Sequence, residues 1–381
     1  MRIAHLWYFV PIFGGAETWA LGLSKALRSL GVTSDIVCWG TEKPRRDKEF
    51  FQVLKGNVSS SPDIIDALMN GAYMADRLGD YDLVCPHHSN VLFPSVFSKS
   101  LYGNQVACIL HSPPIEWQLT EAGMSSYRSV SEKNQQMHTV WEMFMHYSDF
   151  FFTNSVWNQK LYEKYEDISP TPLLGGVDHD VFKPDKRLRE EFREKLKVDD
   201  ETVLLFYSSA AGRRKRHEIL LRGLKELTRR KYRVKCILTC SKDRSTENFH
   251  PLVGRIIRKL GLEKDVFAFP ATSDEEILGL YNASDIYVHP ANNEHLGMSI
   301  MEAMATGKPV VAQANGGVPE IVKDGVEGLL FKTDSVEHMV KCLERLIIDE
   351  ELRENMGRQA MTRAEGFSWL EVAKKFLQTV S

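Results

Sequence analysis

Long apolar runs are missing from this chain of 381 residues. Its longest apolar stretches, such as Val203 to Tyr207 and Phe150 to Phe152, fall far short of the ~20 residues that a membrane-spanning helix needs. The amino-terminal residues carry one positive side chain, Arg2, and no small-residue cleavage site. We therefore expect no secretory signal peptide and a cytoplasmic location.

Cysteine is scarce and scattered. Most of the cysteines lie in or beside apolar runs, where a free thiol packs as a small hydrophobic side chain. The six are Cys38, Cys85, Cys108, Cys236, Cys240 and Cys342. Cys236 and Cys240 are close in sequence, but no further pair of Cys or His completes a zinc set. We expect neither a metal site nor a disulfide framework.

An excess of positive charge is also lacking. The chain has 48 Lys and Arg against 51 Asp and Glu, a net charge of −3. A nucleic-acid-binding protein would show a large basic excess, so nucleic acid is not an expected partner. Hydrophobic residues make up 43% and charged residues 26%, as in soluble globular proteins, and the length fits two domains.

The segment from Ile286 to Glu320 is the most informative part of the sequence. Ile286 to Val288 predicts a buried strand, Met298 to Ala305 a helix, and Val310 to Ala312 the next strand. The loop between the first strand and the helix therefore lies at the carboxyl end of a strand. In open α/β sheets this is where ligands bind.

Backbone N–H groups in this loop, at Leu296, Gly297 and Met298, are predicted to face an anion. Two carboxylates, Glu294 and Glu302, flank the turn. Because carboxylates repel phosphates, we expect them to bind the hydroxyl groups of a sugar and a ribose. The alternative is that Glu294 interacts only with the helix dipole and that Glu302 is a solvated surface residue.

The letters of this segment resemble a family signature. EHLGMSIMEAMATGKPVVA, followed by GGVPE at Gly316 to Glu320, resembles the signature of retaining GT-B glycosyltransferases of family 4, the glycosyl transferases group 1. The resemblance implies an α/β fold with two Rossmann-like domains facing a cleft. It implies an acceptor domain over 1–184, a nucleotide-sugar domain over 185–365, and a final helix within 366–381 that crosses back to the first domain.

The amino-terminal residues predict a strand, a glycine turn and a helix. The strand runs from Arg2 to Phe9 and the helix from about Thr18 to Leu30, an opening that is typical of nucleotide-binding folds. A Gly-Gly pair is as often only a tight turn. The sequence GGAE resembles the family-4 loop, however, which implies that Gly14 and Gly15 lie near the donor phosphates.

His111 follows the predicted strand Gln105 to Leu110, in the stretch ILHSP. This stretch resembles the family-4 position at which a histidine of the first domain faces the donor sugar. His87 and His88, which follow the predicted strand Asp82 to Cys85, are the alternatives. A half-buried histidine bonded to a backbone carbonyl is the other interpretation of such a residue.

A basic turn precedes a predicted helix that starts near His217. Arg213, Arg214, Lys215 and Arg216 would oppose the dipole of that helix, and a bound anion would relieve them. The alternative is a solvated basic turn. The family resemblance implies that Lys215 binds the donor diphosphate.

Two positions depart from the family pattern. Ala210 occupies the position of the usual phosphate-binding arginine, so Arg213 or Arg214 is expected to supply the second charge. Gly175 stands where the family has an asparagine. A nucleotide-sugar-binding protein without catalysis is therefore the alternative function.

Two other stretches carry structural predictions. Lys43 to Leu54 mixes basic and apolar residues and predicts a helix, either on the surface of the core or in a membrane interface. Pro184 and the charged run from Asp185 to Lys197 predict a linker between the domains.

The resemblance implies a retaining hexosyltransferase that acts by a metal-independent front-face mechanism. Its donor would be a GDP- or UDP-sugar, and its acceptor a glycan or a lipid-linked molecule in glycan biosynthesis. An α-mannosyltransferase on the cytoplasmic membrane face is one form of this prediction. The implied catalytic residues are His111, Glu294 and Lys215. The implied donor-binding residues are Gly14, Gly15, Arg213, Arg214, Lys215, Glu294, Leu296, Gly297, Met298 and Glu302.

Overall fold

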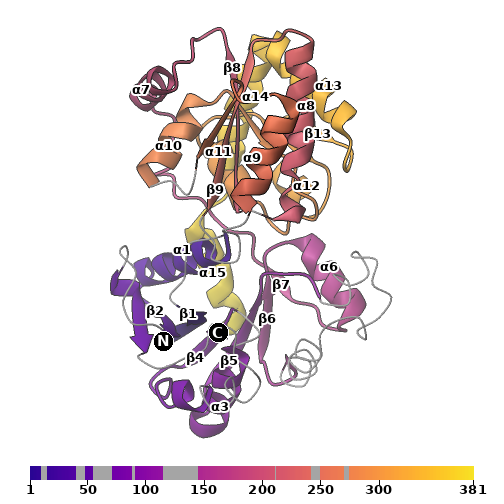
Figure 1. Cartoon of the computed structure of the whole chain (residues 1–381). Helices are drawn as coiled ribbons and strands as arrows, with labels where there is room; N and C mark the ends of the chain where they lie inside the picture. Colours follow the sequence, from indigo (N-terminus) through magenta and orange to yellow (C-terminus); the bar gives the residue numbers. More distant parts are fainter. Residues whose placement is uncertain are drawn as a thin grey trace. The chain divides into compact units, whose positions relative to one another are not determined.

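The computed structural model describes residues 1–9, 15–39, 48–54, 71–87, 91–114, 145–210, 212–241, 249–269 and 274–381. These residues form two compact units. The first unit comprises Met1–Gly175 together with Trp369–Ser381, and the second comprises Gly176–Ser368. Each unit is built around one sheet that is flanked by helices (Figure 1).

The described residues of the first unit form a seven-stranded sheet in which neighbouring strands are parallel. Its strands are β1 (Arg2–Phe9), β2 (Thr33–Trp39), β3 (Phe51–Leu54), β4 (Leu83–Pro86), β5 (Gln105–Leu110), β6 (Phe150–Thr153) and β7 (Thr171–Pro172). The order across the sheet is β3-β2-β1-β4-β5-β6-β7. The chain thus moves outward from β1 to β3 and restarts on the other side of β1, which creates a switch point between β1 and β4.

The last helix of the chain packs within the first unit. The unit's helices include α1 (Gly15–Ser29), α3 (Leu92–Tyr102), α6 (Val156–Tyr165) and α15 (Trp369–Val380). The Trp369 ring occupies the space over Gly22 of α1, where any side chain would overlap it. Trp369 also meets Trp19 edge to face at 6.1 Å between ring centroids, and buried Phe376 lies 4.9 Å from Phe152 of β6. Helix α15 therefore covers both α1 and the sheet.

The second unit contains, within its described residues, a six-stranded parallel sheet in the order β10-β9-β8-β11-β12-β13. Its strands are β8 (Val203–Ala210), β9 (Val234–Ser241), β10 (Val266–Phe269), β11 (Ile286–His289), β12 (Val310–Gln313) and β13 (Gly328–Phe331). The strands β8 and β11 are apolar and buried along most of their length, as expected for a sheet covered on both faces. The switch point of this sheet lies between β8 and β11.

The charged run after Pro184 forms a helix of the second unit rather than a linker. The unit's helices include α7 (Lys186–Leu196), α8 (His217–Arg229), α9 (Phe249–Leu260), α10 (Asp274–Ala283), α11 (Met298–Ala305), α12 (Val318–Ile321), α13 (Val336–Ile348) and α14 (Glu350–Ala364). Asp185 caps α7 by accepting the Leu188 N–H. Phe192 packs over Gly279 of α10, and buried Arg193 bonds Asp285 at 3.1 Å. The linker prediction missed this because the buried side chains are few among many charges.

The helix predicted over Lys43 to Leu54 is wrong for the part that the structure describes. Phe51–Leu54 forms strand β3, which pairs in parallel with β2, and a short 3-10 turn, Lys48–Phe50, precedes it. Phe51 is buried against Trp7 and Ile36, so β-pairing and core burial outweigh the helical pattern. Residues 43–47 lie outside the described residues.

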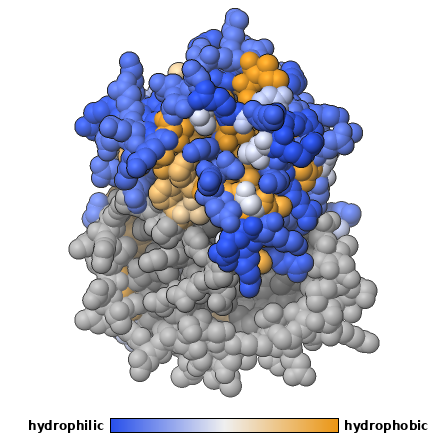
Figure 2. Space-filling view, turned by 45° about the horizontal axis from the view of Figure 1, so that its top comes forward, coloured by the Kyte–Doolittle hydropathy of each residue, from blue (hydrophilic) through white to orange (hydrophobic). Residues whose placement is uncertain are grey.

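In the parts of the chain that are described, no helix is long and apolar enough to cross a membrane. The coloured surface in Figure 2 is mostly hydrophilic, with smaller hydrophobic groups between the polar side chains. The strand, helix and second strand predicted between Ile286 and Ala312 are confirmed as β11, α11 and β12. The predicted α/β class with two Rossmann-like domains is confirmed by the two parallel sheets.

Candidate active site

The switch point of the second sheet brings two predicted residues together. Lys215 lies in the turn after β8, and Glu294 lies in the loop after β11, the neighbouring strand. The Lys215 Nζ donates to the Glu294 Oε2 at 2.6 Å. Both side chains are largely buried, at 16% and 10% exposure. Residues 79 positions apart in sequence therefore form one ion pair where open α/β sheets bind ligands.

Arg214 and His289 complete the surroundings of the Glu294 carboxylate. An Arg214 guanidinium nitrogen lies 3.4 Å from the same Oε2, and the His289 Nε2 lies 3.2 Å from it. Burial alone would raise the pKa of Glu294, but the charges of Lys215 and Arg214 hold it well below its usual value. Burial also lowers the pKa of His289, so a neutral His289 donates its Nε2–H to the carboxylate.

Burial lowers the pKa of Lys215 as well, while the Glu294 carboxylate acts in the opposite direction. Glu294 has two cations beside it, whereas Lys215 has one carboxylate and a competing cation, Arg214. This asymmetry explains why the cluster favours the ionised carboxylate more strongly than the protonated lysine. A second anion at this place would pair with the charge that Glu294 leaves unbalanced.

Backbone contacts hold the basic turn against the loop. The Asn292 N–H donates to the Arg214 carbonyl at 2.8 Å, and the Arg214 side chain donates to the Asn293 carbonyl at 3.1 Å. The Gly317 N–H donates to the Glu294 carbonyl at 2.8 Å. Gly316 has a φ of 61°, and a Cβ there would overlap that carbonyl oxygen. The GGVPE motif thus lets the chain after β12 pass directly against Glu294.

The amino end of α11 adds backbone N–H groups to the same loop. Gly297 occupies the N-cap position with a φ of 92°, and no side chain caps the helix there. Leu296 is buried before it, and Met298 is the first helical residue. A helix start that is capped by no side chain directs its first N–H groups outward, where they can bind an anion.

Glu302 lies on α11 beside Tyr281 of α10. The Tyr281 hydroxyl donates to the Glu302 Oε2 at 2.7 Å and lies 3.2 Å from the Ser299 carbonyl. Burial raises the pKa of Glu302, and the hydrogen bond from Tyr281 opposes that shift. The carboxylate is therefore held in one orientation by a neighbouring hydroxyl group, which a freely solvated surface residue would not be.

The structure separates the two arginines that the sequence left as alternatives. Arg213 and Arg214 are both exposed on the 3-10 turn Arg213–Lys215, and of the two it is Arg214 whose guanidinium reaches the Lys215–Glu294 pair, 3.4 Å from the Glu294 Oε2. Arg216 turns to Asp334 at 2.8 Å. Arg214 is thus the arginine that the fold places beside Lys215.

In the first unit, His111 lies directly after β5 and is half-buried. Its Nε2 is 2.8 Å from the Nδ1 of His87, the residue after β4, so the structure joins the predicted histidine to one of its alternatives. The His111 carbonyl accepts from Asn154 at 3.3 Å. Gly15 is the first residue of α1, while Gly14 and His88 lie outside the described residues.

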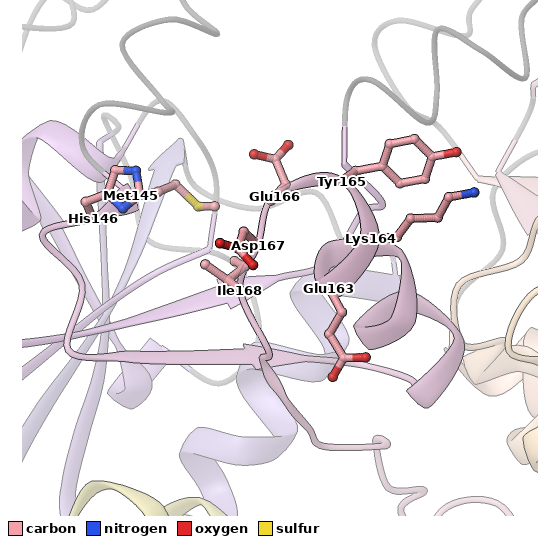
Figure 3. Close-up of a pocket in the computed structure, with 8 residues that line it drawn as sticks. All are labelled: Met145, His146, Glu163, Lys164, Tyr165, Glu166, Asp167 and Ile168. Atoms are coloured by element: carbon pink, nitrogen blue, oxygen red, sulfur yellow. The ribbon is translucent and has the colours of Figure 1, made fainter.

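A pocket elsewhere in the first unit does not suit a diphosphate. Figure 3 shows it at the carboxyl end of α6, whereas the opposite end of that helix contacts the loop of His111 through Asn158. It is lined by Met145, His146, Glu163, Lys164, Tyr165, Glu166, Asp167 and Ile168. Three carboxylates against one lysine would repel phosphate oxygens.

Sequence reasoning missed several residues of these clusters: His5, Tyr281, His289 and Asn315. Asn315 accepts the Asn293 N–H at 3.0 Å and so fixes the loop before Glu294. One signal was present: His5 and His289 are polar residues inside otherwise apolar strands. Such residues need a partner when buried, but only the sheet order shows which partner each one meets.

Comparison with known proteins now bears on this site. Residues 188–363 match the family model of glycosyl transferases group 1. The match agrees with the family resemblance of the motif, and the matched segment contains Arg214, Lys215, Glu294 and Glu302 but not His111.

The curated relatives agree with this family. The chain is 31% identical over 235 residues to a D-inositol 3-phosphate glycosyltransferase of Corynebacterium aurimucosum, covering 59% of this chain and 55% of the relative. It is 31% identical over 197 residues to the protein of the same name from Corynebacterium jeikeium, covering 51% of this chain and 47% of the relative. The chain thus spans about half the length of the curated relatives that it matches.

Solved structures extend the likeness to the whole chain at the level of fold. Anabaena HepE in complex with UDP and glucose has a TM-score of 0.82 at 20% identity, covering 100% of this chain and 99% of HepE. WaaG, a glycosyltransferase involved in lipopolysaccharide biosynthesis, has a TM-score of 0.77 at 17% identity, covering 100% and 99%. These matches confirm the predicted GT-B class of α/β fold.

Proposed function

We propose that the protein is a retaining hexosyltransferase of glycosyltransferase family 4 that uses a nucleotide-diphosphate sugar. The observation that carries the proposal is the largely buried Lys215–Glu294 pair, with the exposed Arg214 beside it, at the switch point between β8 and β11. Two cations and the amino end of α11 flank one loop, an arrangement that suits a diphosphate. The family match over residues 188–363 supports the same assignment.

Each residue has a distinct proposed role. Lys215 and Arg214 neutralise the leaving diphosphate, so the reaction needs no metal ion. Glu294 binds hydroxyl groups of the donor sugar, and Glu302, oriented by Tyr281, binds the ribose. Because Lys215 is held by Glu294 in the structure described here, donor binding would transfer the lysine contact from carboxylate to phosphate. His111 is proposed to contact the donor sugar.

The reaction we propose is front-face transfer with retention of configuration. In that mechanism the departing diphosphate accepts the proton of the attacking hydroxyl group, so no protein carboxylate acts as a nucleophile. The Lys215–Glu294 contact supports this, because a carboxylate held by two cations and a histidine is a weak nucleophile. Its pKa is held low by those charges.

The names of similar proteins supply one candidate donor and one candidate acceptor. HepE was crystallised with UDP-glucose, so UDP-glucose is a first donor to test beside GDP-mannose and other UDP-, GDP- and ADP-sugars. The curated relatives are named for D-inositol 3-phosphate, which is a first acceptor to test beside glycans and lipid-linked acceptors on a membrane surface. Transfer from GDP-mannose would make the protein an α-mannosyltransferase.

The first experiment is a thermal-shift screen against these donors, without metal and again with EDTA. A donor present at roughly 100 times its Kd should stabilise the fold by ~2.7 kcal/mol. We expect one nucleotide class to stabilise the protein equally in both conditions. A shift that requires a divalent metal would contradict metal independence, and no shift with any of the donors would contradict the proposed site.

A transfer assay then separates catalysis from binding. The donor that stabilises the protein is incubated with the candidate acceptors, and both product formation and donor hydrolysis are measured. We expect transfer with an α-linked product from an α-linked donor. Binding without either reaction would instead support the alternative of a nucleotide-sugar-binding protein.

A further inference from the structure

Three histidines from three neighbouring strands of the first sheet lie in one row. His5 is inside β1, His87 follows β4, and His111 follows β5; these strands are adjacent in the sheet order. His5 and His87 are buried, at 0% and 3% exposure, and His111 is half-buried. The row therefore runs from the core to the carboxyl edge of the sheet, beside its switch point.

The rings are joined by two nitrogen–nitrogen contacts. The His5 Nδ1 lies 2.9 Å from the His87 Nε2, and the His87 Nδ1 lies 2.8 Å from the His111 Nε2. The rings of His87 and His111 are inclined by only 22°, with centroids 5.1 Å apart. At that separation the bonded nitrogens lie between the two rings, so the contact is edge to edge and nearly in plane. Each contact requires a proton on one nitrogen and a lone pair on the other.

The buried end of the row decides where the protons lie. Burial lowers the pKa of His5 to about 3, so His5 is neutral and has one ring proton. Within the described part of the chain, the His5 Nε2 is buried with no hydrogen-bond partner. A proton on that nitrogen would be an unpaired buried N–H, which is rarer in proteins than an unpaired acceptor. The proton therefore belongs on Nδ1, from which His5 donates to His87.

This choice propagates along the row. Because His87 accepts from His5 at Nε2, its own proton lies on Nδ1 and is donated to the Nε2 of His111. A neutral His111 then has its proton on Nδ1. The opposite order, with protons directed inward, would leave the unpaired N–H at His5.

We propose that His5 and His87 are positioning residues that fix His111 in the tautomer protonated at Nδ1. His111 would then act as a hydrogen-bond donor to a sugar or phosphate oxygen, and its Nε2 would not serve as a general base because His87 already bonds it. The role toward a sugar ligand rests on the proposed function. The tautomer itself does not, since it is argued from the contacts among the three rings.

The tautomer can be measured directly in the full chain. Long-range proton–nitrogen NMR of the uniformly nitrogen-15-labelled protein distinguishes protonated from unprotonated ring nitrogens, and His111→Gln assigns the His111 signals by their loss. We expect His111 and His5 both to be protonated at Nδ1. A proton on Nε2 of His111, or exchange between the two nitrogens, would overturn the inference.

Two variants of His87 test whether the row is the cause. His87→Leu removes the bond to His111, whereas His87→Asn places an amide N–H near the position of Nδ1. We expect His111 to become a mixture of tautomers in His87→Leu and to keep its Nδ1 proton in His87→Asn. His146→Gln, an exposed position of the same unit, is the control and should change nothing. An unchanged tautomer in His87→Leu would refute the positioning role.

If His87→Leu does not fold, His5→Gln supplies the same test from the other end of the row. Activity provides a separate readout. Given a working transfer assay, His87→Leu should lose roughly tenfold in kcat/KM, and His87→Asn should recover part of it. If the wild-type protein transfers no sugar, the proposed function is contradicted, but the tautomer measured by NMR is not affected. Normal kcat/KM in His87→Leu would overturn the role of the tautomer in catalysis.

Discussion

At the switch point of the first sheet stand imidazole and indole rings, whereas at that of the second stand a carboxylate and two cations. His111 lies 5.3 Å from Trp19 between ring centroids, and its partner His87 lies 5.2 Å from Trp7. In the second unit the same topological position holds the Lys215–Glu294 pair. The same sheet topology thus creates a switch point in each unit. The side chains at each switch point determine whether it suits a neutral hydroxyl group or a charged diphosphate.

Removal of the Glu294 carboxylate is expected to have the largest effect on the difference between the two switch points. Glu294→Ala leaves Lys215 without its carboxylate in a largely buried position, so we expect a loss of about 3 to 5 kcal/mol in the free energy of unfolding. His111→Ala, one strand away from the switch point of the first sheet, removes an imidazole that bonds the ring of His87 and should cost only about 1 kcal/mol. Urea unfolding of both variants measures the difference. Equal losses would show that the two switch points do not differ in electrostatic cost.

Lys215 tests the charged site through catalysis. Lys215→Ala removes a cation from the leaving diphosphate, so kcat should fall roughly 10²-fold. Lys215→Arg retains the charge with a different shape and should fall less. Steady-state kinetics with a saturating donor gives the comparison. An increase in donor KM with kcat unchanged would place Lys215 in ground-state binding instead.

The pH dependence of stability should distinguish the two sites. The pKa of His5 falls from 6.5 to about 3 on folding, so the unfolded chain binds the proton first. The contribution of neutral His5 to the free energy of unfolding is therefore fully present above pH 6.5. It is lost as the pH falls toward 3, at up to about 1.4 kcal/mol per pH unit.

Glu294 also has a lowered pKa, but its unfolded value is 4.5, so its contribution is lost only below that pH. Urea unfolding between pH 7 and pH 3 should show a flatter profile above pH 4.5 for His5→Gln than for Glu294→Gln. Identical profiles in both variants would contradict the assigned pKa of His5.

The smallest effects should come from Glu302 and Tyr281. Glu302→Ala should raise the donor KM roughly tenfold by removing ribose contacts, with kcat little changed. Tyr281→Phe removes the hydroxyl group that bonds Glu302 and the Ser299 carbonyl but leaves the carboxylate itself, so we expect an increase of about threefold in the donor KM. Initial-rate kinetics over a range of donor concentrations measures both. An unaltered donor KM in Glu302→Ala would contradict the ribose assignment.

The sequence predicted much of the second unit because its motif fixes both chemistry and backbone. Gly297 and Gly316 occupy positive-φ positions at the two turns around Glu294, so the letters of the motif encode the loop itself. The alternation of strands and helices gave the sheet class correctly. Lys215 could be selected from a run of four basic residues because the family resemblance aligns it with the lysine of the family.

Other features depend on contacts between distant residues and could not be predicted. The choice of Arg214 over Arg213 follows from which of two adjacent arginines points toward Glu294. The row from His5 to His111 joins residues from three strands, and only the strand order makes them neighbours. Phe51–Leu54 became an edge strand because β2 offered a partner, which local periodicity does not reveal.

The seating of Trp369 over Gly22 has a consequence for how the protein is made. The chain leaves the first unit at Gly175 and returns to it at Trp369, so the second unit is an insertion between two parts of the first. During synthesis, residues 176–368 are released from the ribosome before α15. The inserted unit can therefore fold while its host still exposes the surface of α1 that Trp369 will cover. Chaperones that recognise apolar surface would therefore bind at α1 until α15 covers it.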